Sequence, residues 1–388
     1  MVTKKILYLI AGICLLFLFA CAPKPRAPQA VLDTPEHHVS NGNKFLKAER
    51  INEAFSEFRK AIELDPKFSA AYAGLGLIYG LKNDLENGFE NMKKAEGYAE
   101  GNTQEMAVHV GFMRLYTMGG EKVDKKWLKK VISRFEDAIK IDPDAAAPYF
   151  YMGIAYKMAF EFNDSAKQFS KVLELDKLFT AEADKEFALI QKIQRAMPGS
   201  KVGKAIALLE KITRADTAAL FIEELKVDEL FRNRTKKVFD TSFKSPEAGF
   251  KTGEYGKIAP ATDIQNHVLK ADIDEVIKLE IKGLQPFSDH QYKPYANITR
   301  AEFAIMIEDI LIKIIRDDKL ATKFIGSESP FPDLRNDLPY FNAAMVCTTR
   351  NIIETIDVAT GEFSPSGVVS GADALLSIRI LKNQLKKY

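Results

Sequence analysis

The sequence predicts an all-α protein with two folded parts, a stack of helical hairpins followed by a mostly helical domain of three similar modules. Helix patterns that end on Asp-Pro recur in the first part, as NEAFSEFRKAIELDP from Asn52 and SRFEDAIKIDP from Ser133. In the second part, one short helix start recurs as ITRAD from Ile212, ITRAE from Ile298 and VSGAD from Val369. Recurrence of this kind is the signature of a repeat architecture.

The N-terminus predicts export. Two lysines precede an almost unbroken apolar run at 6–19, the pattern of a signal peptide h-region, which is too short to span a bilayer comfortably. The stretch LFAC, which ends at Cys21, resembles the lipobox of bacterial lipoproteins. The resemblance implies that residues 1–20 are a cleaved signal peptide and that Cys21 carries a lipid. An uncleaved anchor and an ordinary signal peptide are the alternatives.

The segment 21–34 that follows is rich in proline and lacks an apolar period. Such a composition favours extended polyproline II structure, so we expect a semi-rigid tether that holds the folded part away from the lipid surface. Ala22 stands directly after the lipidation candidate, where an aspartate commonly retains lipoproteins at the inner membrane. The resemblance therefore points to the cell envelope, at the outer membrane facing the periplasm.

Charge and cysteine content exclude several classes of protein. Loss of the leader would remove two lysines from 55 basic residues against 53 acidic ones, so no basic surplus draws the mature chain to nucleic acid. Cys347 would be the one remaining free thiol, so no internal disulfide is expected and the fold must rest on a packed core. A chain of 388 residues with 46% hydrophobic content is long enough for two domains.

Residues 35–179 carry a helix-pair pattern with a period of about 34 residues. Small residues recur where two antiparallel helices would approach closely, and aromatic residues recur where neighbouring hairpins would meet. The positions that carry the pattern are Gly42, Phe45, Ala54, Phe58, Ala61 and Pro66, then Tyr72, Leu75, Gly76, Tyr79 and Ala95, and later Tyr149, Met152, Gly153, Tyr156 and Phe169.

This pattern resembles the tetratricopeptide repeat (TPR). The resemblance implies a solenoid whose concave groove holds a peptide or partner protein, followed by a connecting or capping helix at 180–200. A helical bundle with coincidental spacing is the alternative. We expect the His37-His38 pair to lie in a solvated loop rather than to form a metal site, because no other ligand type stands at metal spacing.

The recurring helix starts share a capping chemistry. The hydroxyl of Thr213 or Thr299 is expected to accept a hydrogen bond from the backbone N–H three residues on, while the threonine N–H donates to the carboxylate of Asp216 or Glu302. The acid also lies in the first helical turn, where the helix dipole favours negative charge. Ser370 begins the third copy. Capping explains the hydroxyl and the acid, but it does not explain the arginine.

Residues 201–388 also repeat beyond these helix starts, in modules near 201–240, 261–320 and 330–388. In the third module, FPDLR from Phe331 is expected to open a helix, and GEFSP to make a turn before the cap. This order of features resembles the S-layer homology (SLH) module. Three SLH modules commonly form one pseudo-threefold prism that binds cell-wall polymers in grooves between modules. The resemblance is strong for the second and third modules and weak for the first.

In that family the arginine of the tetrapeptide is a principal ligand residue, and it corresponds to Arg214 and Arg300 here. A planar guanidinium suits bidentate contact with an acidic group on a glycan. Gly371 stands in this place in the third copy. Arginines that only decorate a capped helix are the alternative. Glycan-binding candidates are Arg214, Arg300, Thr213, Thr299, Asp216 and Glu302, and for the last four capping is the favoured role.

The sequence thus predicts a lipid-anchored, non-catalytic protein of the cell envelope that binds cell-wall glycan through the SLH-like domain and recruits a protein through the TPR domain. No catalytic motif, cofactor or metal is indicated. An alternative is a TPR lipoprotein scaffold for outer-membrane or secretion-complex assembly, with a degenerate SLH domain. A wall-modifying enzyme with two facing carboxylates is the third hypothesis.

Overall fold

The computed structural model describes residues 25–234 and 260–386. The expected signal peptide, the lipidation candidate Cys21 and the end of the expected first module at 235–240 lie outside the described residues. Within the described ranges, no helix is both long and apolar enough to cross a membrane.

The chain divides into an N-terminal unit, Met1–Phe187, and a C-terminal unit, Ala188–Tyr388. The boundary falls inside helix α10 (Thr180–Ala196), in the segment expected to connect the two domains. Each unit is helical, and no β-strand forms among the described residues beyond isolated bridges.

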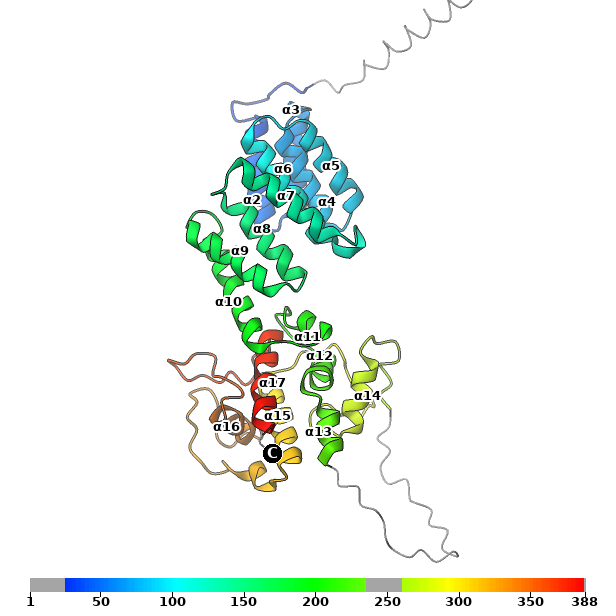
Figure 1. Ribbon diagram of the computed structural model, residues 1–388, viewed down its shortest axis with the longest axis vertical. Coiled ribbons are helices and arrows are strands. Elements are labelled where there is room, and N and C mark those ends of the chain that lie inside the picture. The colour runs from blue at the N-terminus through cyan, green and yellow to red at the C-terminus, as the bar shows by residue number, and fades with distance from the viewer. Residues whose placement is uncertain (1–24, 235–259, 387–388) are drawn as a thin grey trace, which may run out of the picture. The chain divides into compact units, whose positions relative to one another are not determined.

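The N-terminal unit is a succession of helical hairpins that leads into α10 (Figure 1). The pairs are α2–α3, α4–α5, α6–α7 and α8–α9. Their bounds are α2 Pro35–Lys47, α3 Ile51–Leu64, α4 Ser69–Leu81, α5 Leu85–Gly97, α6 Asn102–Gly119, the short 3-10 helix η1 Gly120–Lys122, α7 Trp127–Ile141, α8 Ala146–Met158 and α9 Phe162–Leu175.

Proline ends two of these helices as the sequence predicts. Helix α3 stops before Asp65-Pro66, and Asp65 is extended, with φ −135° and ψ 102°. Helix α7 stops in the same way before Asp142, with φ −147° and ψ 106°. A residue that precedes proline is disfavoured in the α region, so the chain must leave the helix there. Each stop frees the chain to turn into the next hairpin.

Phe58 shows how neighbouring helices pack in this unit. Its side chain is fully buried, and its ring lies against Gly42 of α2 and Gly74 of α4. A β-carbon on Gly42 would come within 2.7 Å of the ring, and one on Gly74 within 2.4 Å. The aromatic residue thus occupies space that two glycines leave open. Met92 of α5 and Phe169 of α9 are likewise fully buried.

The C-terminal unit consists of shorter helices joined by structured loops. Phe221 and Phe303 stack in its interior with ring centroids 6.1 Å apart. The bounds are α11 Lys201–Ile206, α12 Arg214–Leu220, the π-helix η2 Phe221–Leu225, α13 Val227–Arg234, α14 Lys270–Lys278, α15 Arg300–Ile315, the 3-10 helix η3 Asp318–Thr322, α16 Phe341–Thr349 and α17 Gly371–Leu385.

A closed ring of three backbone hydrogen bonds joins the segments that precede α12, α15 and α17. The N–H of Ile212 donates to the carbonyl of Val369 at 2.9 Å, and the N–H of Val369 donates to Ile298 at 3.1 Å. The N–H of Ile298 completes the ring by donating to Ile212 at 3.0 Å. Each of the three residues stands directly before a helix cap. The ring therefore holds the three helix starts together at one place in the unit.

The caps at these starts have the predicted chemistry in two cases. Thr213 with Asp216 and Thr299 with Glu302 form complete capping boxes. At the third start, the hydroxyl of Ser370 accepts from the N–H of Asp373 at 3.1 Å. Thus the hydroxyl group and the acid of the repeated tetrapeptide form hydrogen bonds that cap the N-terminus of a helix.

The prediction that a helix opens at Phe331 is wrong, because α16 begins ten residues later at Phe341. Pro332 and Pro339 each disfavour helical geometry at the residue before them. Asp333 uses its carboxylate to hold a distant turn. Residues 332–340 therefore form a structured loop rather than the first turns of a helix.

Candidate functional site

Two equivalent turns lie beside the candidate arginines of the C-terminal unit. Asp263 accepts bonds from the consecutive backbone N–H groups at 292–293, at 2.8 Å each. Asp333 does the same for those at 363–364, at 2.9 and 2.6 Å. The second residue of each turn has a positive φ, 57° and 55°, and a proline follows it. A carboxylate thus fixes each turn in one shape and aims its carbonyl groups at the preceding module.

Arg214 is held by one of these turns. Its Nε donates to the carbonyl of Tyr292 at 2.7 Å, its Nη1 to Gly283 at 2.5 Å and its Nη2 to Gln285 at 2.9 Å. The guanidinium also lies over the ring of Phe287, 4.8 Å from the centroid. The residue is only 6% exposed, and this burial lowers the pKa of its side chain. Arg214 therefore joins two modules, and a glycan would have to displace these carbonyls to reach it.

Arg300 makes the corresponding contacts with fewer carbonyls. Its Nε donates to Phe363 at 2.7 Å, and its Nη2 donates to the carbonyl of Glu354. The guanidinium lies 5.0 Å from the ring centroid of Phe363. No carbonyl among the described residues accepts from Nη1, and the side chain is only partly buried. Of the two candidate arginines, Arg300 is the more exposed and the one whose Nη1 has no acceptor among the described residues.

The third copy of the helix start is closed by backbone. A β-carbon on Gly371 would lie 1.7 Å from the carbonyl oxygen of Ile206. The N–H of Gly371 donates to the carbonyl of Leu209 at 2.8 Å. Any side chain at this position would collide with the chain before α12, so the absence of an arginine follows from close backbone packing.

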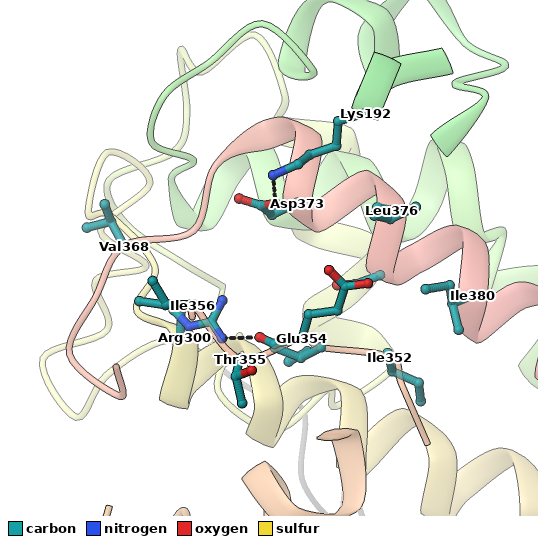
Figure 2. A pocket seen from close by; sticks show the side chains of 12 residues that line it. Lys192, Arg300, Ile352, Glu354, Thr355, Ile356, Val368, Asp373, Leu376 and Ile380 are labelled. Atoms are coloured by element: carbon teal, nitrogen blue, oxygen red, sulfur yellow. Dashed lines mark hydrogen bonds and ion pairs between the residues drawn. The ribbon is translucent and has the colours of Figure 1, made fainter. Parts of the chain in front are cut away.

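A pocket of about 340 Å³ lies beside Arg300, between the loop at 352–356 and helix α17 (Figure 2). Lys192 of α10 and Asp373 of α17 form an ion pair at its edge, with Nζ and Oδ1 2.6 Å apart. Glu354 also lines the pocket. Its carboxylate has no hydrogen-bond or ion-pair partner among the described residues. The rest of the lining combines the hydroxyl residues Thr355 and Ser377 with apolar side chains, which are those of Ile352, Ile353, Ile356, Val368, Leu376 and Ile380.

The guanidinium of Arg300 remains positively charged although it is partly buried. Burial lowers the pKa of the guanidinium, while the negative charges of Asp373 and Asp333 raise it. Because arginine begins with a pKa far above neutrality, the side chain remains a cation at physiological pH. A charged donor beside an apolar wall and a carboxylate without a partner is an arrangement suited to binding a charged ligand.

The N-terminal unit presents a different surface. Leu81, Met118 and Met158 stand at or near the C-terminal ends of α4, α6 and α8, one in each successive hairpin. They are 49%, 37% and 49% exposed. Methionine is flexible and polarizable, and it is frequent on surfaces that adapt to peptide partners. Sequence reasoning did not single out these residues, because exposure cannot be read from a repeat pattern.

The expectation that His37 and His38 lie in a solvated loop is wrong, because both stand in helix α2 and the side chain of His38 is only 12% exposed. Its Nδ1 lies 2.7 Å from a carboxylate oxygen of Glu57, and its Nε2 lies 2.9 Å from one of Asp33. Both bonds form together when both ring nitrogens carry hydrogen. The two carboxylates face opposite nitrogens and share no point for a metal ion, and no cluster suited to a metal occurs in the described ranges.

Comparisons with known proteins bear on the repeats. No protein-family model matches the chain. Superkiller protein 3 of Schizosaccharomyces pombe is 21% identical over 285 residues, which cover 64% of this chain and 19% of that protein. The chain therefore spans about a fifth of the length of this relative. A thermophilic TPR protein of Thermus thermophilus has a TM-score of 0.36 at 17% identity, over 51% of this chain and 96% of that one.

The N-terminal unit is a TPR-like repeat. Its own geometry carries the assignment, through paired helices, proline stops and an aromatic residue packed on glycines between hairpins. Scaffolds of this type present extended surfaces for protein partners.

Proposed function

We propose that the protein is a lipid-anchored, non-catalytic tether of the cell envelope. Cys21 would hold it to the membrane, the TPR-like unit would recruit a protein, and the C-terminal unit would bind cell-wall glycan. Arg300 and its pocket are the observation on which the glycan part rests. A partly buried guanidinium with a free donor, next to a cavity of about 340 Å³, suits an acidic group on a wall polymer.

We restrict the glycan site to Arg300. Arg214 donates to three backbone carbonyls, and Thr213, Thr299, Asp216 and Glu302 are engaged in capping boxes. These residues support the site by fixing the helix starts. We thus propose Arg300 as the ligand contact, because its Nη1 has no acceptor among the described residues, whereas Arg214 is buried and bonded through all three of its nitrogens.

A scaffold without wall binding is the second candidate. The burial of Arg214 and the backbone that fills the space beside Gly371 favour it, because two of the three equivalent places then offer no ligand contact. In that case the C-terminal unit would be a spacer, and the TPR-like unit would carry the function by assembling envelope complexes.

Co-sedimentation of the full chain, kept in detergent, with purified cell-wall sacculi tests the tether. We expect the wild type to pellet with sacculi and Arg300→Ala to remain largely in the supernatant. Because Arg300 also bonds two carbonyls, its loss could disturb the fold. Leu376→Trp is therefore the second variant, since it fills the pocket without removing any hydrogen bond that involves Arg300.

Arg335→Ala is the matched control. This arginine is 78% exposed on its side chain, it pairs with Asp337 two residues away, and it does not line the pocket. It should pellet like the wild type. If the wild type stays in solution, or if Arg300→Ala and Leu376→Trp pellet as well as the control, the site at Arg300 is refuted and the scaffold is favoured.

A further inference from the structure

We infer that the pocket beside Arg300 takes a zwitterionic group, an ammonium and a carboxylate held a few ångströms apart on one aliphatic chain. This inference rests on the proposed wall binding and narrows its ligand. The wall component with this chemistry is a peptide stem that ends in a diamino acid. An acidic sugar alone would not use all the charged groups that the pocket presents.

The charges of the pocket balance. Lys192 and Arg300 supply two cations, and Glu354 and Asp373 supply two carboxylates. Lys192 and Asp373 are paired with each other at 2.6 Å. The groups left for a ligand are the free Nη1 of Arg300 and the carboxylate of Glu354. One attracts a carboxylate and the other an ammonium.

The two free groups belong to different segments that meet at the pocket. Arg300 begins helix α15, and Glu354 lies in the loop that follows α16. The bond from Arg300 Nη2 to the backbone carbonyl of Glu354 fixes the spacing of these segments. Figure 2 shows the Glu354 side chain directed towards α17, on the side of Arg300 that faces the cavity. A ligand that enters the cavity meets both charges.

The wall between these charges is suited to methylene groups. Ile356 and Leu376 face the cavity from opposite segments, and Ile352 and Ile380 extend the apolar lining. The side chain of a diamino acid has this order of groups, an aliphatic stem with charges at its end. A sugar ring has hydroxyl groups around its edge and would bury less apolar surface against the isoleucines than a methylene chain does.

A purely anionic ligand also meets an unfavourable group. The carboxylate of Glu354 is exposed at the rim, and the partner of Lys192 is the carboxylate of Asp373. Since Lys192 neutralises Asp373, the carboxylate of Glu354 is the charge that would repel a purely anionic ligand. The same carboxylate of Glu354 would attract a ligand that also carries an ammonium.

Calorimetric titration of the full chain in detergent with the tripeptide L-Ala-γ-D-Glu-meso-diaminopimelate tests the inference. In two modified probes, the amine at the far end of the diaminopimelate side chain is acetylated, or the carboxyl on that same carbon is amidated. We expect the tripeptide to bind and each modification to weaken binding about tenfold or more, as loss of one charge-assisted hydrogen bond does. Glu354→Gln should weaken the parent tripeptide by a similar factor and leave the affinity for the acetylated probe unchanged.

Glu362→Gln is the control, because Glu362 is exposed in the next turn and does not line the pocket. It should bind all three probes like the wild type. The inference is overturned if the acetylated probe binds as tightly as its parent, if Glu354→Gln has no effect, or if the tripeptide does not bind at about 1 mM. These results would leave intact any sedimentation with sacculi that depends on Arg300 and Leu376, so the two proposals fail separately.

Discussion

The carbonyl oxygen of Ile206 occupies the space where Gly371 would otherwise carry a side chain, 1.7 Å from the position of a β-carbon. At the two equivalent helix starts, an arginine reaches across to carbonyls of the next module instead. The three junctions of the C-terminal unit are therefore closed in two ways, twice by a guanidinium and once by direct backbone contact.

Gly371→Ala should destabilise the C-terminal unit. Since the colliding atom is backbone, the chain before α12 must move, and overpacking of this kind costs about 1–3 kcal/mol. Urea unfolding followed by hydrogen exchange of peptides from α11 and α17 would measure the loss. Gly199→Ala is the control, because its new β-carbon meets nothing nearer than 3.8 Å. Equal midpoints for the two variants would contradict the collision.

Arg214→Ala should destabilise the same unit without any ligand present. The change removes the donor from three carbonyls, of which that of Tyr292 is buried, and an unsatisfied buried acceptor costs about 1–3 kcal/mol. Arg214→Lys should recover only part of the loss, since an ammonium cannot reproduce the planar fork of a guanidinium. Urea midpoints of these variants would be compared with Arg335→Ala, which removes an exposed ion pair. A midpoint for Arg214→Ala equal to that of Arg335→Ala would exclude the structural role.

The tetrapeptide shows how far the sequence alone could lead. The roles of Thr213 and Asp216 were predictable because their partners lie three residues away in the same helix start. The role of Arg214 was not, because its carbonyl partners are 69 to 78 residues away and every residue type has a carbonyl. His38 was missed for a similar reason, since its farther partner Glu57 stands in the next helix. Hydrogen bonds between residues of one helix start can be predicted from the sequence, whereas contacts to distant backbone groups cannot.

Phe58→Ala should weaken the TPR-like unit strongly. The ring is fully buried against two glycines, so its removal opens a cavity that neither glycine can fill. Loss of a buried phenylalanine costs about 3–5 kcal/mol. Thermal unfolding by circular dichroism would measure it, with Arg59→Ala, an exposed neighbour, as control. If both variants have the same midpoint of thermal unfolding, Phe58 does not hold the first two hairpins in contact.

Residues 26–33, which the sequence predicts to be part of an extended tether, instead dock on the end of α3, and they should stay docked in mild acid. Arg26 pairs with Asp33 through two hydrogen bonds of 2.7 and 2.9 Å, and the N–H of Arg26 donates to the carbonyl of Glu63 at the end of α3. The bond from Arg26, followed by that from His38, holds the pKa of Asp33 well below its usual range. A depressed pKa stabilises the folded form above the unfolded pKa and loses that effect only as pH falls through the folded value. Docking should therefore persist at about pH 4, where an ordinary aspartate is half protonated.

Hydrogen exchange of the peptide 25–34, corrected for the intrinsic pH dependence, would follow this docking. The N–H of Gln29 reports on it directly, because it donates to the carboxylate of Asp33. Asp33→Asn should lose protection at neutral pH as well as in acid, since the amide carries no charge for Arg26 or His38. Glu49→Gln, at an exposed position, should behave like the wild type. Loss of wild-type protection already at pH 5, or unchanged protection in Asp33→Asn, would show that the ion pair does not hold the segment.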